Sequence, residues 1–120
     1  MKRKKLKSLK SLRNRLDIVF SKWIRLRDEG KPCITCGKYA PLQCGHFIKR
    51  QHPATRWDER NAAGQCVRCN LYLGGAQDEF AAQIVDRYRE GTLEELLTLK
   101  HVTVHFTRSD LEAMIERFSA

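Results

Sequence analysis

Two Cys-x2-Cys pairs constrain this chain more than any other feature of its sequence. The pairs are Cys33/Cys36 and Cys66/Cys69, and residues 37–65 lie between them. A two-residue spacer lets one tight turn direct both sulfurs at one ion, so two such turns complete a tetrahedral thiolate shell, which selects zinc. Four sulfur ligands leave no coordination position for water or substrate. We therefore predict a structural zinc site whose occupancy is coupled to folding.

The total of five cysteines fits metal binding better than disulfide bonding. An odd count, the paired spacing and the lack of an export signal favour a reducing compartment, so we expect a cytoplasmic protein. The basic start MKRKKLKSLK is not followed by an apolar stretch, and no uncharged run is long enough to cross a bilayer, so no membrane partner is expected. A chain of 120 residues, 42% hydrophobic and 31% charged, fits one globular domain over 1–120.

The net charge of +9 is concentrated at the start of the chain. Residues 1–31 contain 12 Lys and Arg against three acidic residues, whereas the two signs balance in 32–120. Apolar residues recur at three- and four-residue steps over 6–27, which predicts an amphipathic helix that stops near Gly30. We assign its apolar stripe to core contact or a dimer seam, and its basic face to the phosphate backbone of DNA. A solubilising tail is the alternative. The candidate DNA-binding residues of this basic helical arm are Lys4, Lys5, Lys7, Lys10 and Arg13.

The arm is followed by a cysteine-rich core over 32–75 and a helical C-terminal part over 76–120. In the core we expect short strands near 42–48 and 61–66, and a helix from about Cys69 that two glycines interrupt. The expected features of the C-terminal part are a helix over 78–90 ended by Gly91, a capping box of Thr92 with Glu95, a strand over 101–106, and a capping box of Ser109 with Glu112.

Between the cysteine pairs the sequence reads CGHF and then RWDERNAAGQ, and Asn70 follows the second pair at once. This order resembles the zinc-containing ββα-metal, or HNH-type, nucleases, and is most similar to the phage Rap/NinG recombination-nuclease family. The segments FSKWIRLRDEGKPCITCGK, CGHFIKR and RWDERNAAGQCVRCN carry the resemblance. The Holliday-junction resolvases of T-even phages share the two cysteine knuckles and the Asn after the last Cys.

The resemblance implies an α+β fold: a small zinc-stapled ββα-metal (HNH/treble-clef-like) core, flanked by an N-terminal basic amphipathic helix and C-terminal helices. It also implies a phage or prophage protein in a bacterial host. His46 would be the general base, Asn70 a ligand of a catalytic Mg²⁺ or Mn²⁺, and Asn61 the residue that orients the His46 loop. An imidazole with an ordinary pKa of about 6.5 suits the base role, and magnesium prefers oxygen ligands. The alternatives are a packed strand residue for His46, a helix cap for Asn70 and a turn residue for Asn61.

One position departs from many HNH-type sites, which have an Asp, a second metal ligand, directly before the base. This chain has Gly45 there. A Gly-His pair is the usual form in the Rap/NinG family, so we do not interpret it as inactivation. The second ligand of the catalytic ion stays open, and the thiol among the candidates suits magnesium least. The candidates are Asp58, Glu59, His52 and Cys44.

The leading hypothesis is a Mg/Mn-dependent endodeoxyribonuclease that cuts branched recombination intermediates such as Holliday junctions or displacement loops. The branched substrate comes from the resemblance, and symmetric cutting implies a homodimer. The alternative is a zinc-stabilised DNA-binding module without catalysis. A zinc protein-interaction domain does not explain the charge of the arm. Trp57 either stacks on DNA or lies in the core, and further candidate DNA-binding residues are Lys49, Arg50 and Arg56.

Overall fold

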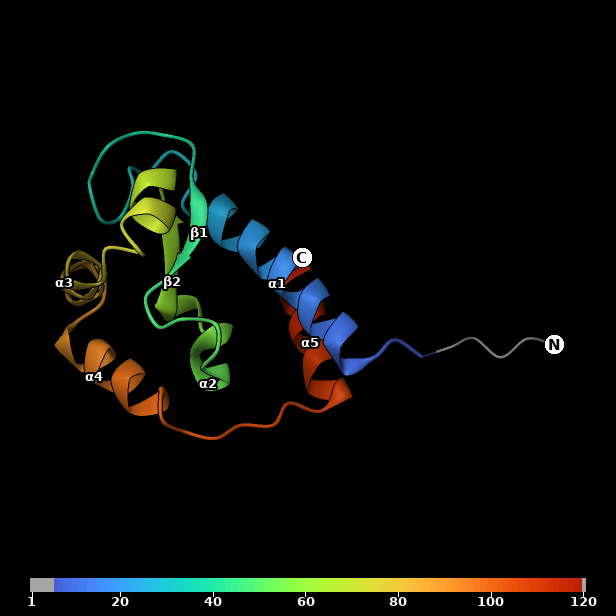
Figure 1. The fold of residues 1–120 in the computed structure, drawn as a ribbon. Coiled ribbons are helices and arrows are strands. Elements are labelled where there is room, and N and C mark those ends of the chain that lie inside the picture. Colours follow the sequence, from blue (N-terminus) through green and yellow to red (C-terminus); the bar gives the residue numbers. More distant parts are fainter. Residues whose placement is uncertain (1–5, 120) are drawn as a thin grey trace.

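Two short strands form an antiparallel sheet, and helices surround it (Figure 1). The computed structural model describes residues 6–119, so the arm residues Lys4 and Lys5 lie outside the described range. The elements in chain order are α1 (Leu9–Arg27), β1 (Gln43–His46), α2 (Pro53–Arg56), the 3-10 helix η1 (Glu59–Asn61), β2 (Ala62–Gln65), the π-helix η2 (Arg68–Tyr72), α3 (Gln77–Arg87), α4 (Glu90–Leu99) and α5 (Arg108–Ser119). The predicted α+β class is confirmed.

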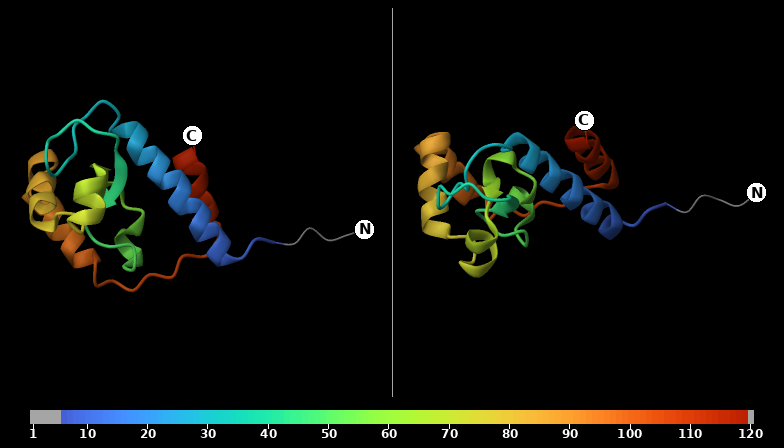
Figure 2. Two further views of the ribbon diagram at one scale, coloured as in Figure 1. Left: turned by 45° about the horizontal axis from the view of Figure 1, so that its top comes forward. Right: turned by 90° about the horizontal axis from the view of Figure 1, so that it is seen from above.

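The apolar stripe of α1 packs inside the chain. Helix α1 begins after the N-cap Ser8. The Phe20 ring of α1 packs edge to face against the Phe118 ring of α5, with ring centroids 4.9 Å apart. Helices α1 and α5 lie side by side in both views of Figure 2. The core contact expected for this stripe is therefore confirmed where α5 covers it, and the dimer seam stays a prediction for the exposed start of the stripe at Leu6 and Leu9. The buried residues of α1, all at most 5% exposed, are Leu12, Leu16, Phe20 and Ile24.

Strands β1 and β2 pair antiparallel, with Gln43 opposite Gln65 and His46 opposite Ala62. The expected strands are confirmed with shorter bounds. Successive residues of a strand point to opposite faces, so Ala62 joins the core under α1 and α5 while Ala63 joins the core under α3 and α4. The sheet therefore separates two small cores. The connection between the strands contains α2 and η1, which fold back against the end of β1.

The expected boundary between α3 and α4 is wrong. Gly91 lies inside α4 and does not end the preceding helix, and Thr92 is buried in the first turn of α4 where it caps nothing. The break falls at Tyr88 and Arg89, and the backbone of Arg89 is fully extended. The local sequence signals placed the break too late. The observed break lets the apolar faces of α3 and α4 pack on one core, which is a tertiary requirement that local signals do not carry.

Residues 101–106 form no strand, because within 6–119 the strands β1 and β2 pair only with each other. They connect α4 to α5 as extended chain, and Phe106 packs edge on against Trp57 with ring centroids 5.5 Å apart. The capping box of α5 is formed by Thr107 and Asp110, whose side chains each accept a hydrogen bond from the other's backbone N–H. The predicted box of Ser109 with Glu112 is wrong by two residues.

A buried carboxylate joins the end of α1 to the sheet and to α3. Asp28 is 1% exposed and accepts hydrogen bonds from the guanidinium of Arg27 and from the N–H of Gly64 (2.8 Å). Arg87 of α3 lies 3.4 Å away. Burial opposes the negative charge, but the Arg27 guanidinium and the Gly64 N–H outweigh it and lower the pKa of Asp28 to about 2. The carboxylate is therefore charged at neutral pH and fixes where the first cysteine turn begins.

We expect Asp28→Ala to lower the free energy of unfolding by about 3–5 kcal/mol, because it leaves the guanidinium of Arg27 without its buried partner. Urea denaturation at pH 7 measures the difference. Glu29→Ala is the matched control, since Glu29 is exposed, and it should change stability by no more than about 0.5 kcal/mol. Equal effects of the two substitutions would show that the buried ion pair does not stabilise the fold.

Candidate functional site

Four cysteine sulfurs lie within 4.8 Å of one another, those of Cys33, Cys36, Cys66 and Cys69. The first pair lies in a turn that is closed by a hydrogen bond from the Gly37 N–H to the Cys33 carbonyl (2.9 Å), with Gly37 at a φ of 74°. The second pair joins the end of β2 to η2. The predicted convergence of the four thiols is confirmed, and their number and type fit a tetrahedral metal ion such as zinc.

The electrostatics of the cluster also fit a cation. At Cys33, burial opposes ionisation, but the Thr35 hydroxyl and the N–H groups of Cys66 and Cys36 outweigh it and lower the pKa to about 6. At Cys69, burial and the neighbouring sulfurs raise the pKa to about 12. The protein alone therefore favours one thiolate and disfavours another in the same cluster. A bound cation removes this conflict, because it stabilises all four thiolates at once.

His46 ends β1 and is held by a backbone carbonyl. Its Nε2 lies 3.0 Å from the carbonyl oxygen of Arg56. Because a carbonyl only accepts hydrogen bonds, Nε2 carries the proton and Nδ1 keeps its lone pair. Burial lowers the pKa of His46, and the nearby charges of Arg50 and Arg56 lower it further against the opposing effects of this hydrogen bond and of Asp17. The imidazole is therefore neutral at pH 7 and able to take up a proton.

Asn61 closes the segment that follows His46. It is fully buried at the end of η1. Its Oδ1 accepts from the N–H of Ile48 (2.9 Å), and its Nδ2 donates to the carbonyls of Ile48 (3.0 Å) and Thr55 (3.1 Å). Three hydrogen bonds from one amide thus fix both ends of the loop between β1 and α2. This geometry suits the orienting role better than that of a simple turn residue.

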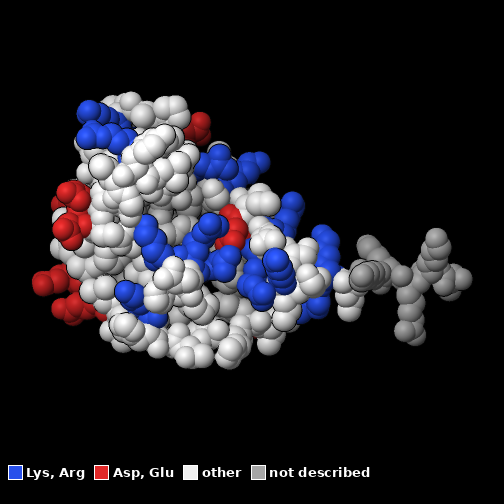
Figure 3. All heavy atoms as spheres, in the orientation of Figure 1, with Lys and Arg blue, Asp and Glu red and all other residues white. Residues whose placement is uncertain are grey.

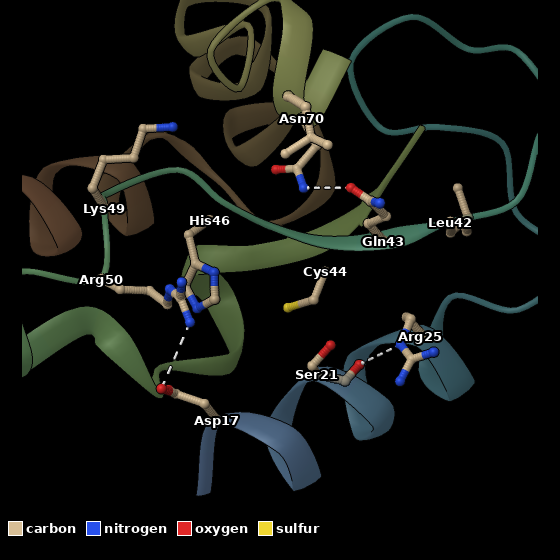
Figure 4. A pocket seen from close by; sticks show the side chains of 11 residues that line it. Asp17, Ser21, Arg25, Leu42, Gln43, Cys44, His46, Lys49, Arg50 and Asn70 are labelled. Atoms are coloured by element: carbon tan, nitrogen blue, oxygen red, sulfur yellow. Dashed lines mark hydrogen bonds and ion pairs between the residues drawn. The ribbon is translucent and has the colours of Figure 1, made fainter. Parts of the chain in front are cut away.

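Asn70 lies in the π-helix η2, directly after the last cysteine. Its Nδ2 donates to Oε1 of Gln43 (2.9 Å), and Val67 takes the N-cap position, so Asn70 does not cap the helix. Within 6–119 its Oδ1 accepts no hydrogen bond, and in Figure 4 this oxygen points away from Gln43 toward the side of His46 and Lys49. A free amide oxygen is the kind of ligand that magnesium accepts.

His46 and Asn70 share one pocket of about 510 Å³ between α1 and β1. Figure 4 shows the imidazole on one side and the carboxamide on the other, with Lys49 and Arg50 beside them. Both cationic side chains are exposed, and Lys49 Nζ donates to the Gly74 carbonyl (2.9 Å). The other polar side chains that line the pocket are Asp17, Ser21, Arg25, Gln43 and Cys44.

Sequence reasoning missed Asp17, which organises the pocket from α1. Its carboxylate accepts hydrogen bonds from the guanidinium of Arg56 and from Nε1 of Trp57 (3.0 Å), and Arg50 lies 3.6 Å away. The carbonyl of Arg56 in turn holds His46. Asp17 thus fixes α2, and α2 fixes the imidazole. The available signal was its position, because Asp17 is the first acidic residue of the basic arm.

The candidates for a second metal ligand do not gather at the pocket. Asp58 pairs with Arg60, and Glu59 with Arg117, both outside the residues that line it. His52 lies at the start of α2 and also does not line it. Cys44 does line it, but burial raises the pKa of its thiol to about 12, so it stays protonated.

Packing explains why glycine precedes the histidine. A Cβ on Gly45 would lie 1.9 Å from Oε1 of Gln65 on the opposite strand. Gln65 is fully buried, and its Nε2 donates to the hydroxyl of Thr35 (3.0 Å) and the carbonyl of Gly75 (2.9 Å). It therefore links the turn of the first cysteine pair to the backbone that follows η2. An Asp at position 45 would displace that link, so the Gly-His pair follows from this chain's own core.

The candidate DNA-binding residues fall into two groups. Arg56 is held by Asp17, and Trp57 is 6% exposed in the core, so neither is presented to a ligand. The others lie outward: Lys7, Lys10, Lys49 and Arg50 are exposed and Arg13 is half-buried. In Figure 3 blue side chains spread over α1 and around the pocket, whereas red ones gather over α3 and α4 at the opposite edge. On this side of the molecule the basic and acidic side chains therefore occupy different regions.

The fold and the site define a small α+β protein with a two-stranded sheet, a cluster of four cysteines that could hold a metal ion such as zinc, and a polar pocket beside it. The family model described as "Bacteriophage Lambda NinG protein" matches residues 1–120, so the chain belongs to the NinG family. Protein ninG of Escherichia phage 933W and that of Salmonella phage P22 are each 34% identical to it over 77 residues, and that of Escherichia phage lambda is 32% identical over 77 residues. These alignments cover 62% of this chain and 38% of each relative.

No solved structure matches the chain. Within residues 6–119, no helix combines the length and the apolar character that crossing a membrane requires. The relatives named above are phage proteins, in agreement with the phage origin expected from the sequence.

Proposed function

We propose that this chain carries the catalytic centre of a Mg/Mn-dependent endodeoxyribonuclease that nicks branched DNA. The observation that carries the proposal is a pocket rimmed by cations that holds both a neutral His46 and an Asn70 amide oxygen. Within residues 6–119, Nδ1 of His46 has no hydrogen-bond partner. The branched substrate rests on the resemblance to the Rap/NinG nucleases. In this proposal β1, β2 and η2 are the ββα-metal core, and zinc at the four cysteines holds it together.

The imidazole performs the proton transfer. Nδ1 of His46 accepts a proton from a water molecule as the water oxygen bonds to phosphorus and the bond from phosphorus to the leaving sugar oxygen breaks. The leaving oxygen then takes a proton from solvent, and His46 releases its proton to solvent. A magnesium or manganese ion, when bound, would stabilise the negative charge that develops on the phosphate. The Arg56 carbonyl keeps the ring in the tautomer that this step requires.

The pocket offers mainly neutral oxygens to such an ion. Two of them, Asn70 Oδ1 and Gln43 Oε1, belong to side-chain amides that are hydrogen-bonded to each other. The carboxylate of Asp17 is already paired with Arg56. Magnesium keeps several waters and is bound by few protein oxygens together with substrate phosphates. The residues present therefore fit an ion that binds together with DNA and weakly without it.

The test is nicking of a labelled four-way junction with Mg²⁺, with Mn²⁺ and with EDTA. We expect cutting with either ion and none with EDTA. Asn70→Ala should need a higher ion concentration for half-maximal rate, by about tenfold or more, whereas Asn70→Asp should need no more than wild type, because its carboxylate supplies an oxygen ligand. Salt-sensitive binding of the junction with no nicking in any condition would favour the non-catalytic DNA-binding module instead.

Symmetric cutting of a four-way junction requires two such pockets, so the proposal includes a homodimer on DNA. The buried part of the α1 stripe is not available for it, because α5 covers that part within the same chain. Sedimentation of the protein with and without a junction tests this part separately from nicking.

A further inference from the structure

Three large apolar side chains are exposed in succession directly after Asn70. Leu71, Tyr72 and Leu73 are 61%, 81% and 51% exposed. Single exposed apolar residues are ordinary on a protein surface, but three large ones on one short segment expose much apolar surface to water and indicate a contact site. In Figure 1 this segment is the yellow-green coil on the near side of the sheet, and in Figure 3 the same place is a white projection with blue atoms beside it.

The segment is held rigidly. The Leu73 N–H donates to the Arg68 carbonyl (2.9 Å) in the π-helical pattern, and the Gly75 N–H donates to the Cys69 carbonyl (2.8 Å). Gly74, Gly75 and Ala76 all have positive φ, of 61°, 93° and 47°, which is unfavourable for the alanine. Together with the four-cysteine cluster at its base, this hydrogen-bonded backbone presents the three apolar side chains outward. A π-helical turn is rare and is often found at functional sites.

The exposed set is continuous with the pocket. Leu71 itself lines the pocket, and Asn70 precedes it in the chain. Lys49 is bonded to the Gly74 carbonyl, so a cation is fixed at the foot of the segment, and Arg50 lies next to it. A partner that touches the three apolar side chains therefore also meets positive charge and the His46–Asn70 pair.

We propose that Leu71, Tyr72 and Leu73 form a wedge that enters DNA where its base stack is interrupted, with the Tyr72 ring stacked on the exposed base pair. Apolar side chains enter base steps in this way, and aromatic rings stack on bases without regard to sequence. In an intact duplex the wedge has to break stacking first, whereas at a branch the stack is already open. The wedge would thus place a phosphate near the branch in the pocket.

The placement of a phosphate in the pocket rests on the proposed function, whereas the wedge itself requires only that the chain binds DNA. DNA fits the segment better than a second copy of the chain does. Two copies meeting through this tip would bring the fixed cations Lys49 and Arg50 of each against those of the other, whereas DNA supplies both a flat apolar surface and the matching negative charge.

The experiment uses a four-way junction with 2-aminopurine at the branch, because the fluorescence of this base reports its stacking. All proteins carry His46→Ala to prevent cutting. We expect binding of this parent to change the branch-point signal, and Tyr72→Ala to abolish the change and lower affinity for the junction relative to linear duplex by about tenfold. Tyr72→Phe should behave like the parent. Tyr39→Ala is the matched control, since Tyr39 is 76% exposed and lies outside the pocket.

The possible results separate the two proposals. If the protein with His46 intact never nicks the junction while the His46→Ala parent shows the Tyr72-dependent signal, the wedge is supported and the proposed nuclease is contradicted. A junction bound by the parent with no change at the branch point overturns the wedge, as does an equal loss from Tyr39→Ala. Sedimentation gives the remaining outcome: if Tyr72→Ala turns a dimer into a monomer without DNA, the segment binds a second copy, and the wedge is overturned.

Discussion

His46→Ala is expected to reduce the rate of junction nicking by about 10²–10⁴-fold, the usual contribution of a general base. The substitution removes the only group in the pocket, among the described residues, that is neutral and basic near pH 7. Single-turnover nicking of a labelled junction measures the loss. His105→Ala is the matched control, because His105 is exposed in the connection between α4 and α5. Equal rates for wild type and His46→Ala would remove the imidazole from the mechanism.

The pH dependence of nicking should carry the signature of the same residue. The imidazole accepts a proton only when neutral, so the rate is lost as the pH falls through the pKa of His46. Burial holds that pKa below 6.5, and the cations Arg50 and Arg56 act in the same direction while Asp17 opposes them. We therefore expect wild type to stay active at pH values where an ordinary histidine is already protonated, with the acidic limb of the profile below pH 6.5.

The second large effect concerns the four cysteines. Cys66→Ser is expected to abolish stoichiometric zinc binding and cooperative folding, because structural zinc contributes about 10–16 kcal/mol to the folding of small zinc domains. Far-ultraviolet circular dichroism and metal analysis measure the two losses. Cys44→Ser is the matched control, since Cys44 lies outside the cluster and should leave one zinc per chain. A Cys66→Ser protein that keeps its zinc and its folded signal would contradict a four-sulfur site.

The sequence predicted the parts of the structure that local rules decide. The two-residue spacers place each cysteine pair in one turn, and the three- and four-residue steps of α1 identify its buried face. The partners of those parts depend on tertiary packing. Nothing local shows that α5 covers α1, or that Asp17 meets Arg56, which is 39 residues away in the chain. The alternation in 101–106 failed as a strand signal for the same reason, since a strand also needs an unpaired neighbour.

The candidate site was also predicted only in part from the sequence. The sequence order indicated His46 and Asn70, and the structure places both in one pocket. The sequence did not indicate Gln43 as the partner of the Asn70 amide, because that contact depends on where β1 passes the second cysteine pair. Nor did it explain the glycine before His46, which follows from the buried side chain of Gln65 on the neighbouring strand.

The chain of contacts from Asp17 through Arg56 to His46 joins the outer helix to the imidazole. We expect a displacement of α1 to reach the ring through these two hydrogen-bonded links, the guanidinium of Arg56 on Asp17 and the carbonyl of Arg56 on His46. Binding of a nucleic acid against α1 and alignment of the His46 imidazole would then be coupled. A poorly seated duplex would leave the acceptor out of line even with every reacting group present.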